Sequence, residues 1–173
     1  MSPQPAPIPP PGPTPSRVPD WPLPPYRYVP GLHPHPFRSA GGHMFVGGAP
    51  PPEAPWDPST PWAEDRRYLR GLDLYDHRYY WEAHEALEAL WHFAPRDSAE
   101  SPLLQGLIQG AAMALKRHTG QIQASDRLLE RALLHLSLAE SRAGREQRGL
   151  DLEVVRQHLR AFSEGGDWPR LTR

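Results

Sequence analysis

The sequence predicts an all-α fold: a compact bundle of about five helices in antiparallel hairpins, preceded by a proline-rich extended N-terminal leader. Three observations favour it. From residue 60 onward, apolar residues recur at helical spacing, and no segment alternates as a strand does. Glycine or proline separates the helical segments at short intervals. All but three of the 24 prolines lie within residues 1–62, the exceptions being Pro95, Pro102 and Pro169.

Composition excludes several classes of function. The chain of 173 residues has no cysteine, which excludes disulfide frameworks, thiolate zinc sites and cysteine nucleophiles. A net charge of -1 gives no general electrostatic reason to bind nucleic acid or an anionic membrane. Residues 1–16 lack the basic and apolar regions of a signal peptide, and no apolar stretch approaches ~20 residues. We therefore expect a cytoplasmic protein with neither nucleic-acid nor membrane partners.

Two kinds of segment make up the leader. Residues 1–20 are of low complexity and predict a disordered or polyproline-II-like tail. Residues 21–59 are rich in aromatic residues and predict an extended segment that packs on the helical domain. This segment also carries His33, His35 and His43. Alternate residues of an extended chain share a face, so the first two could ligate a metal; the simpler alternative is loop polarity and capping.

The helical domain is predicted over residues 60–165, with residues 166–173 as a C-terminal tail. Its first helix has Thr60 as N-cap and Pro61 at the first helical position. A turn at residues 76–78 ends it.

Four further helices follow. The second covers residues 79–93 before Pro95, and the third covers residues 101–119, ended by Gly120. The fourth covers residues 122–143, and Asp151 caps the fifth. Within the third helix, Gly106 and Gly110 indicate close approach of a neighbouring helix, since each interior glycine costs up to ~1 kcal/mol against alanine.

Residues 79–93 carry the ionisable groups of greatest interest. At ~100° per residue, His84 and Glu88 project onto the inward arc and lie one turn apart. Glu82 projects to the opposite side, while Glu85 and His92 lie at a border. The same arc includes aromatic and apolar residues: Tyr80, Trp81, Leu87 and Trp91. A buried carboxylate requires donors, and Gln105 and Gln109 of the third helix could supply them.

Three interpretations of the pair stay open. It could be a structural polar network that fixes helix register. It could be a metal site for Zn, Mn or Fe, with His84 and Glu88 as ligands and His92 one turn further along. It could also be a general acid and base in a pocket roofed by the leader. His-Glu-x-x-Glu differs by one residue from the His-Glu-x-x-His of zinc proteases, whose second residue, here Glu85, is the general base.

The segment Trp81-Glu82-Ala83-His84-Glu85-x-x-Glu88-x-x-Trp91, followed by Leu103-Leu104-Gln105-Gly106-Leu107-Ile108-Gln109, resembles the bacterial and archaeal family called domain of unknown function 309. The resemblance covers about residues 64–143. It implies a compact all-α fold and no particular activity. It also implies the motif positions His84, Glu85, Glu88, Trp91, Gln105 and Gln109.

Two hypotheses of function follow. In the first, a polar centre of His84 and Glu88, lined by Trp81, Trp91, Gln105 and Gln109, binds a divalent metal or a small ligand. In the second, the His/Glu/Gln network is structural, and the helical hairpins or the leader engage a protein partner or a second copy of the chain.

Overall fold

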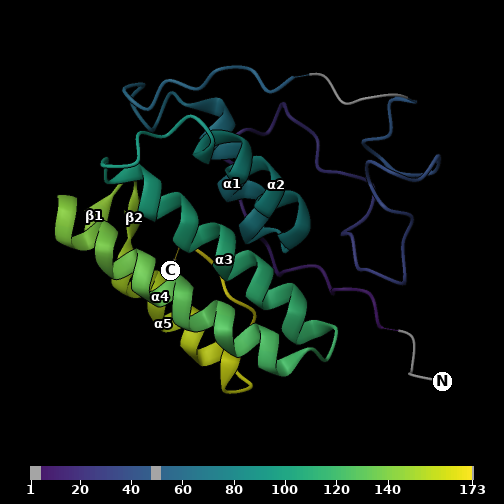
Figure 1. The fold of residues 1–173 in the computed structure, drawn as a ribbon. Helices are drawn as coiled ribbons and strands as arrows, with labels where there is room; N and C mark the ends of the chain where they lie inside the picture. The colour runs from purple at the N-terminus through teal and green to yellow at the C-terminus, as the bar shows by residue number, and fades with distance from the viewer. Residues whose placement is uncertain (1–4, 48–51, 173) are drawn as a thin grey trace.

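The protein is described by a computed structural model that covers residues 5–47 and 52–172. Its helices are α1 (Arg66–Asp76), α2 (Tyr80–Trp91), α3 (Glu100–His118), α4 (Ile122–Ala143) and α5 (Leu152–Ser163). Two short strands, β1 (Glu146–Gln147) and β2 (Leu150–Asp151), pair as an antiparallel hairpin. The leader crosses the side of α1 and α2, as Figure 1 shows. The predicted all-α fold is confirmed.

The helix bounds agree with prediction except at the start of α1. Asp65, rather than Thr60, is the N-cap: its carboxylate accepts the Tyr68 N–H at 3.0 Å. Residues 62–64 form a turn before it. At α5 the predicted cap is correct, because the Asp151 carboxylate accepts the N–H groups of Glu153 and Val154.

The β1–β2 hairpin connects α4 and α5, where the sequence predicted no strand. Two residues of positive φ, Arg148 at 45° and Gly149 at 77°, form its turn. A Cβ at Gly149 would lie 2.7 Å from the Trp62 ring, so the position requires glycine on two grounds. Two-residue strands are too short to produce a detectable alternation.

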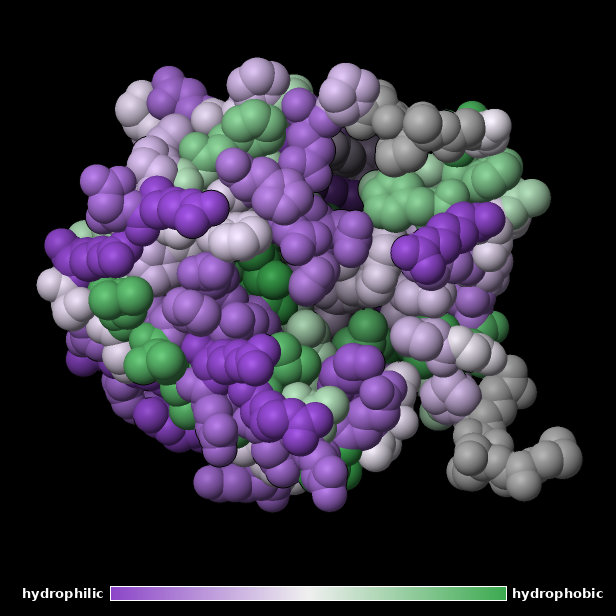
Figure 2. Space-filling view, in the orientation of Figure 1, coloured by the Kyte–Doolittle hydropathy of each residue, from purple (hydrophilic) through white to green (hydrophobic). Residues whose placement is uncertain are grey.

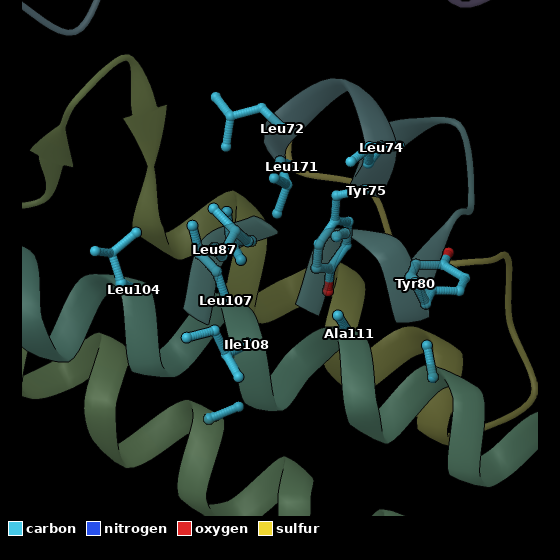
Figure 3. Close-up of a cluster of buried hydrophobic side chains, with 14 of the residues drawn as sticks. Leu72, Leu74, Tyr75, Tyr80, Leu87, Leu104, Leu107, Ile108, Ala111 and Leu171 are labelled. Carbon is cyan, nitrogen blue, oxygen red and sulfur yellow. The ribbon is translucent and has the colours of Figure 1, made fainter. Parts of the chain in front are cut away.

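Helix α3 lies at the centre of the bundle, between α2 and α4. The predicted close approach is confirmed, since a Cβ on Gly106 would lie 2.7 Å from Leu136 and one on Gly110 would lie 2.8 Å from the Tyr75 hydroxyl. Figure 3 shows how α1, α2, α3 and the C-terminal tail meet in the core, where Tyr75, Leu87, Leu107 and Leu171 are almost fully buried.

Residues 5–20 pack on the helices, unlike the disordered tail that their composition predicts. Val18 is 2% exposed. The Asp73 carboxylate, itself buried, accepts the N–H groups of Arg17 and Val18 and the hydroxyl of Ser16. The Arg17 guanidinium forms ion pairs of 3.0 Å with Asp73 and 2.7 Å with Asp76. Specific polar contacts therefore hold a segment that has little apolar mass of its own.

The C-terminal tail is anchored at the same end of α1. The Leu171 N–H donates to Asp76 Oδ1 at 2.7 Å, and the Tyr80 hydroxyl donates to the Pro169 carbonyl at 2.9 Å. The leader and the tail thus share the Asp76 carboxylate. Within the residues that the structure describes, no helix is long and apolar enough to cross a membrane.

We expect Asp73→Ala to release the N-terminal part of the leader. The substitution removes one of the two ion pairs of Arg17 and the acceptor of the Ser16 hydroxyl and of the Arg17 and Val18 N–H groups, and breaking a buried pair typically costs about 3 kcal/mol. Urea denaturation should show that loss in the free energy of unfolding, and trypsin should cleave at Arg17. Asp20→Ala is the matched control, because the Asp20–Arg66 pair is exposed on both sides and should contribute little. Equal stability of the two variants would contradict the anchoring role of Asp73.

Candidate functional site

Helix α2 places its ionisable residues at the edge of the core. Ala83, Leu87 and Leu90 are fully buried against the bundle. The side chains of His84 and Glu88 are 28% and 38% exposed. The predicted burial of this pair is therefore wrong: the apolar face of α2 is narrower than the helical projection suggested, and the pair lies at its border with solvent.

His84, Glu85 and Glu88 form one cluster. His84 Nε2 lies 3.7 Å from Glu88 Oε2. One potential ligand atom from each of the three residues lies within 4.8 Å of the other two. His84 Nδ1 is buried and has no hydrogen-bond partner among the described residues. The cluster thus presents an imidazole and two carboxylates over a region small enough for one cation.

The environment of Glu85 is acidic. Burial raises the pKa of Glu85, and the nearby carboxylates of Glu88 and Glu53 raise it further. The charges of His84 and Arg38 lower the pKa of Glu85. Because Glu53 and Arg38 belong to the leader, the leader contributes to the electrostatics of this site.

His92 does not join the cluster, although the sequence suggested it as a third ligand. Its Nδ1 lies 2.9 Å from Glu53 Oε2, and both side chains are largely exposed. The structure instead brings Glu85 to the His84–Glu88 pair. Glu85, which the sequence suggested as a catalytic base, is thus the third residue of the cluster.

Gln105 and Gln109 lie in two different surroundings. Gln109 Oε1 lies 2.9 Å from His135 Nδ1 on α4. Gln105 lines a cavity with Trp91 and His92 at the end of α2. The predicted centre therefore divides into two parts, the His84 cluster and the cavity beyond Trp91.

Trp81 lies under an aromatic part of the leader. The rings of Tyr28, His35 and Phe37 contact it edge-on, with centroids 5.3 to 5.5 Å away. Since Trp81 is one turn before Glu85, these rings cover α2 beside the cluster.

A buried pair that the sequence did not predict lies on the other side of α2. His43 Nε2 is 3.0 Å from Glu82 Oε1, and the two side chains are 5% and 3% exposed. The Tyr28 N–H donates to the same oxygen at 3.0 Å, whereas Glu82 Oε2 is buried with no partner among the described residues. Helical projection assigned Glu82 to solvent because it ignored the leader, whose aromatic content was the available signal.

His33 and His35 follow the loop-capping alternative. His33 Nδ1 accepts the Val29 N–H at 3.2 Å, and His35 Nδ1 accepts the Phe37 N–H at 3.3 Å. The His33 ring also stacks on Tyr26. These contacts shape the leader loop and engage Nδ1 of both histidines with the backbone.

Comparison with known proteins finds a match to one family model and to no individual protein. Residues 68–128, which span most of α1, all of α2 and α3 and the start of α4, match the model of the family described as Domain of unknown function (DUF309). The predicted resemblance is thereby confirmed. No curated protein and no solved structure matches the chain.

We expect the free energy of unfolding of the Glu82→Gln variant to rise relative to that of the wild type as the pH increases. Burial raises the pKa of Glu82 above its ordinary value of 4.5, so the folded protein holds this proton more tightly than the unfolded chain. The wild type therefore loses stability as the pH rises from about 4.5 through the folded pKa, by about 1.4 kcal/mol for each unit of difference between the two pKa values. Urea denaturation of both proteins across this range measures the difference. Parallel stability profiles would contradict the shift.

Proposed function

We propose that this chain, whose residues 68–128 match the DUF309 family model, binds a divalent metal ion through His84, Glu85 and Glu88. The observation that carries the proposal is the convergence of three ligand atoms within 4.8 Å on one face of α2. A purely structural network would be expected to satisfy its own buried polar atoms, yet His84 Nδ1 is buried without a partner among the described residues.

The ligand set suits a borderline metal. Neutral imidazole with carboxylates favours zinc, manganese or iron. Three protein ligands would leave at least one coordination position open, as catalytic zinc sites do. A cation would also relieve the repulsion among Glu85, Glu88 and Glu53, which metal-free protein must tolerate.

The proposal retains two expectations from composition. The protein acts in the cytoplasm, and its partners do not include nucleic acid, because the net charge of -1 gives no general attraction to a polyanion.

A protein-interaction module is the second candidate function. Leu134 and Leu138, one turn apart on α4, are 67% and 40% exposed. Figure 2 shows apolar residues scattered among the polar residues of this side of the molecule. In this candidate function, Leu134 and Leu138 contact a partner protein or a second copy of the chain. Sedimentation of the wild type beside a Leu134→Ser, Leu138→Ser variant tests self-association.

Elemental analysis after equilibration with zinc, followed by removal of free metal, tests the metal site. We expect about one equivalent in the wild type and its loss in a His84→Ala, Glu88→Ala double variant. His135→Ala is the matched control, because His135 is also part-buried and bonded to a polar side chain, but lies on α4. It should retain the metal.

Thermal unfolding separates the metal site from a structural network. Bound zinc should stabilise the wild type, by about 2.7 kcal/mol at a hundredfold excess over Kd, and should leave the double variant unchanged. If neither protein binds metal and the double variant melts far lower, the His84–Glu88 pair is structural and the proposal is wrong.

A further inference from the structure

A second feature lies at the end of α2, where a cavity of about 460 Å³ opens between this helix, the following loop and the first turns of α3. It is lined by Trp91, His92, Ala94, Arg96, Ser101 and Gln105. Its size falls within the range of ~300–1,000 Å³ typical of small-molecule sites.

The walls of the cavity are held in place. Ser101 is 7% exposed, and Trp91 packs against the core. The loop that carries Arg96 is fixed from α4, since the Arg142 guanidinium donates to the carbonyls of Arg96 at 3.2 Å and Ser98 at 2.7 Å. The cavity is therefore formed by the fold and does not depend on a ligand to assemble it.

Arg96 is the one arginine or lysine among the residues that line the cavity, whereas the carboxylates of Asp97 and of Glu100, in the first turn of α3, are not part of that lining. Among the described residues, neither Arg96 nor Arg142 forms an ion pair with a carboxylate, and the Arg96 side chain is exposed at the cavity. Ser101 and Gln105 add hydroxyl and amide donors, and the positive end of the α3 dipole lies in the same turn as Ser101. The Trp91 indole adds a flat apolar wall. A guanidinium with polar donors beside an indole is suited to a carboxylate on an aromatic body.

The opposite edge of the cavity adjoins the proposed metal site. His92, which lines the cavity, follows Glu88 by one helical turn of about 5.4 Å, and its N–H donates to the Glu88 carbonyl at 3.1 Å. The carboxylates of Glu53 and Glu88 on this side oppose an incoming anion. A metal ion on the His84 cluster would reduce that opposition.

We propose that this cavity binds a small aromatic carboxylate, with its anionic group on Arg96 and its ring against Trp91, and that metal at His84, Glu85 and Glu88 strengthens the binding. The second part rests on the proposed metal site, whereas the first does not.

The direct test is titration of the zinc-free protein, in EDTA, with 2-naphthoate and with the neutral 2-naphthalenemethanol. The indole N–H signal of Trp91, assigned by its loss in Trp91→Phe, reports binding by NMR. We expect naphthoate to shift this signal at concentrations at least tenfold lower than the alcohol does. Arg96→Gln should remove this preference, whereas Arg127→Gln, an exposed arginine on α4, should retain it. Equal binding of acid and alcohol, or an unchanged preference in Arg96→Gln, would overturn the anion site.

The same titration in zinc instead of EDTA tests the coupling. Zinc should increase the affinity for naphthoate at least threefold in the wild type and leave it unchanged in the His84→Ala, Glu88→Ala variant. Naphthoate binding that depends on Arg96 but not on zinc would overturn the coupling and retain the anion site. Zinc binding without any naphthoate binding would retain the proposed function and reject the cavity as a ligand site.

Discussion

Buried carboxylates on α1 and α2 impose the constraint on which the rest of the structure depends. Asp73, Asp76 and Glu82 are all at most 6% exposed, although they lie outside the apolar face that α1 and α2 turn toward α3. A carboxylate removed from water requires hydrogen bonds or an opposite charge to remain ionised. The leader supplies most of them, through Arg17, the backbone N–H groups and His43, and the C-terminal tail supplies the Leu171 N–H. The helices α1 and α2, the leader and the C-terminal tail are thus parts of one fold.

This constraint also determines the surroundings of the candidate site. Because the leader is anchored on α1 and α2, its aromatic loop covers Trp81 and its charged residues Arg38 and Glu53 act on Glu85. The cluster of His84, Glu85 and Glu88 is therefore bordered by the leader on one side and by the cavity at Trp91 along the helix. A metal ion and an organic anion in these two places would interact through one helical turn of α2.

The features that the sequence predicted correctly are those that apolar periodicity and helix capping determine. It placed α4 and the Asp151 cap correctly and identified the close approach at Gly106, because those features depend on local pattern. It misplaced the polar residues of α2. Periodicity identifies the apolar face that α2 turns toward the bundle. The leader covers another side of α2 as an extended chain, and its ring contacts and hydrogen bonds follow no repeat in the sequence. Glu82 was consequently assigned to solvent and His84 to the interior, whereas the structure has Glu82 buried and His84 at the border. The resemblance to the family is confirmed by the match over residues 68–128, but it could not divide the motif residues between the cluster and the cavity.

Amide hydrogen exchange at three leader residues tests most directly whether the leader is part of the fold. The N–H groups of Arg17 and Val18 donate to Asp73, and that of Tyr28 donates to Glu82. If these contacts exist in solution, the three amides should exchange as slowly as amides that open only with substantial unfolding. Exchange at the rate of an unstructured chain would contradict the anchoring of the leader, and the environment described for the α2 site would then lose its basis.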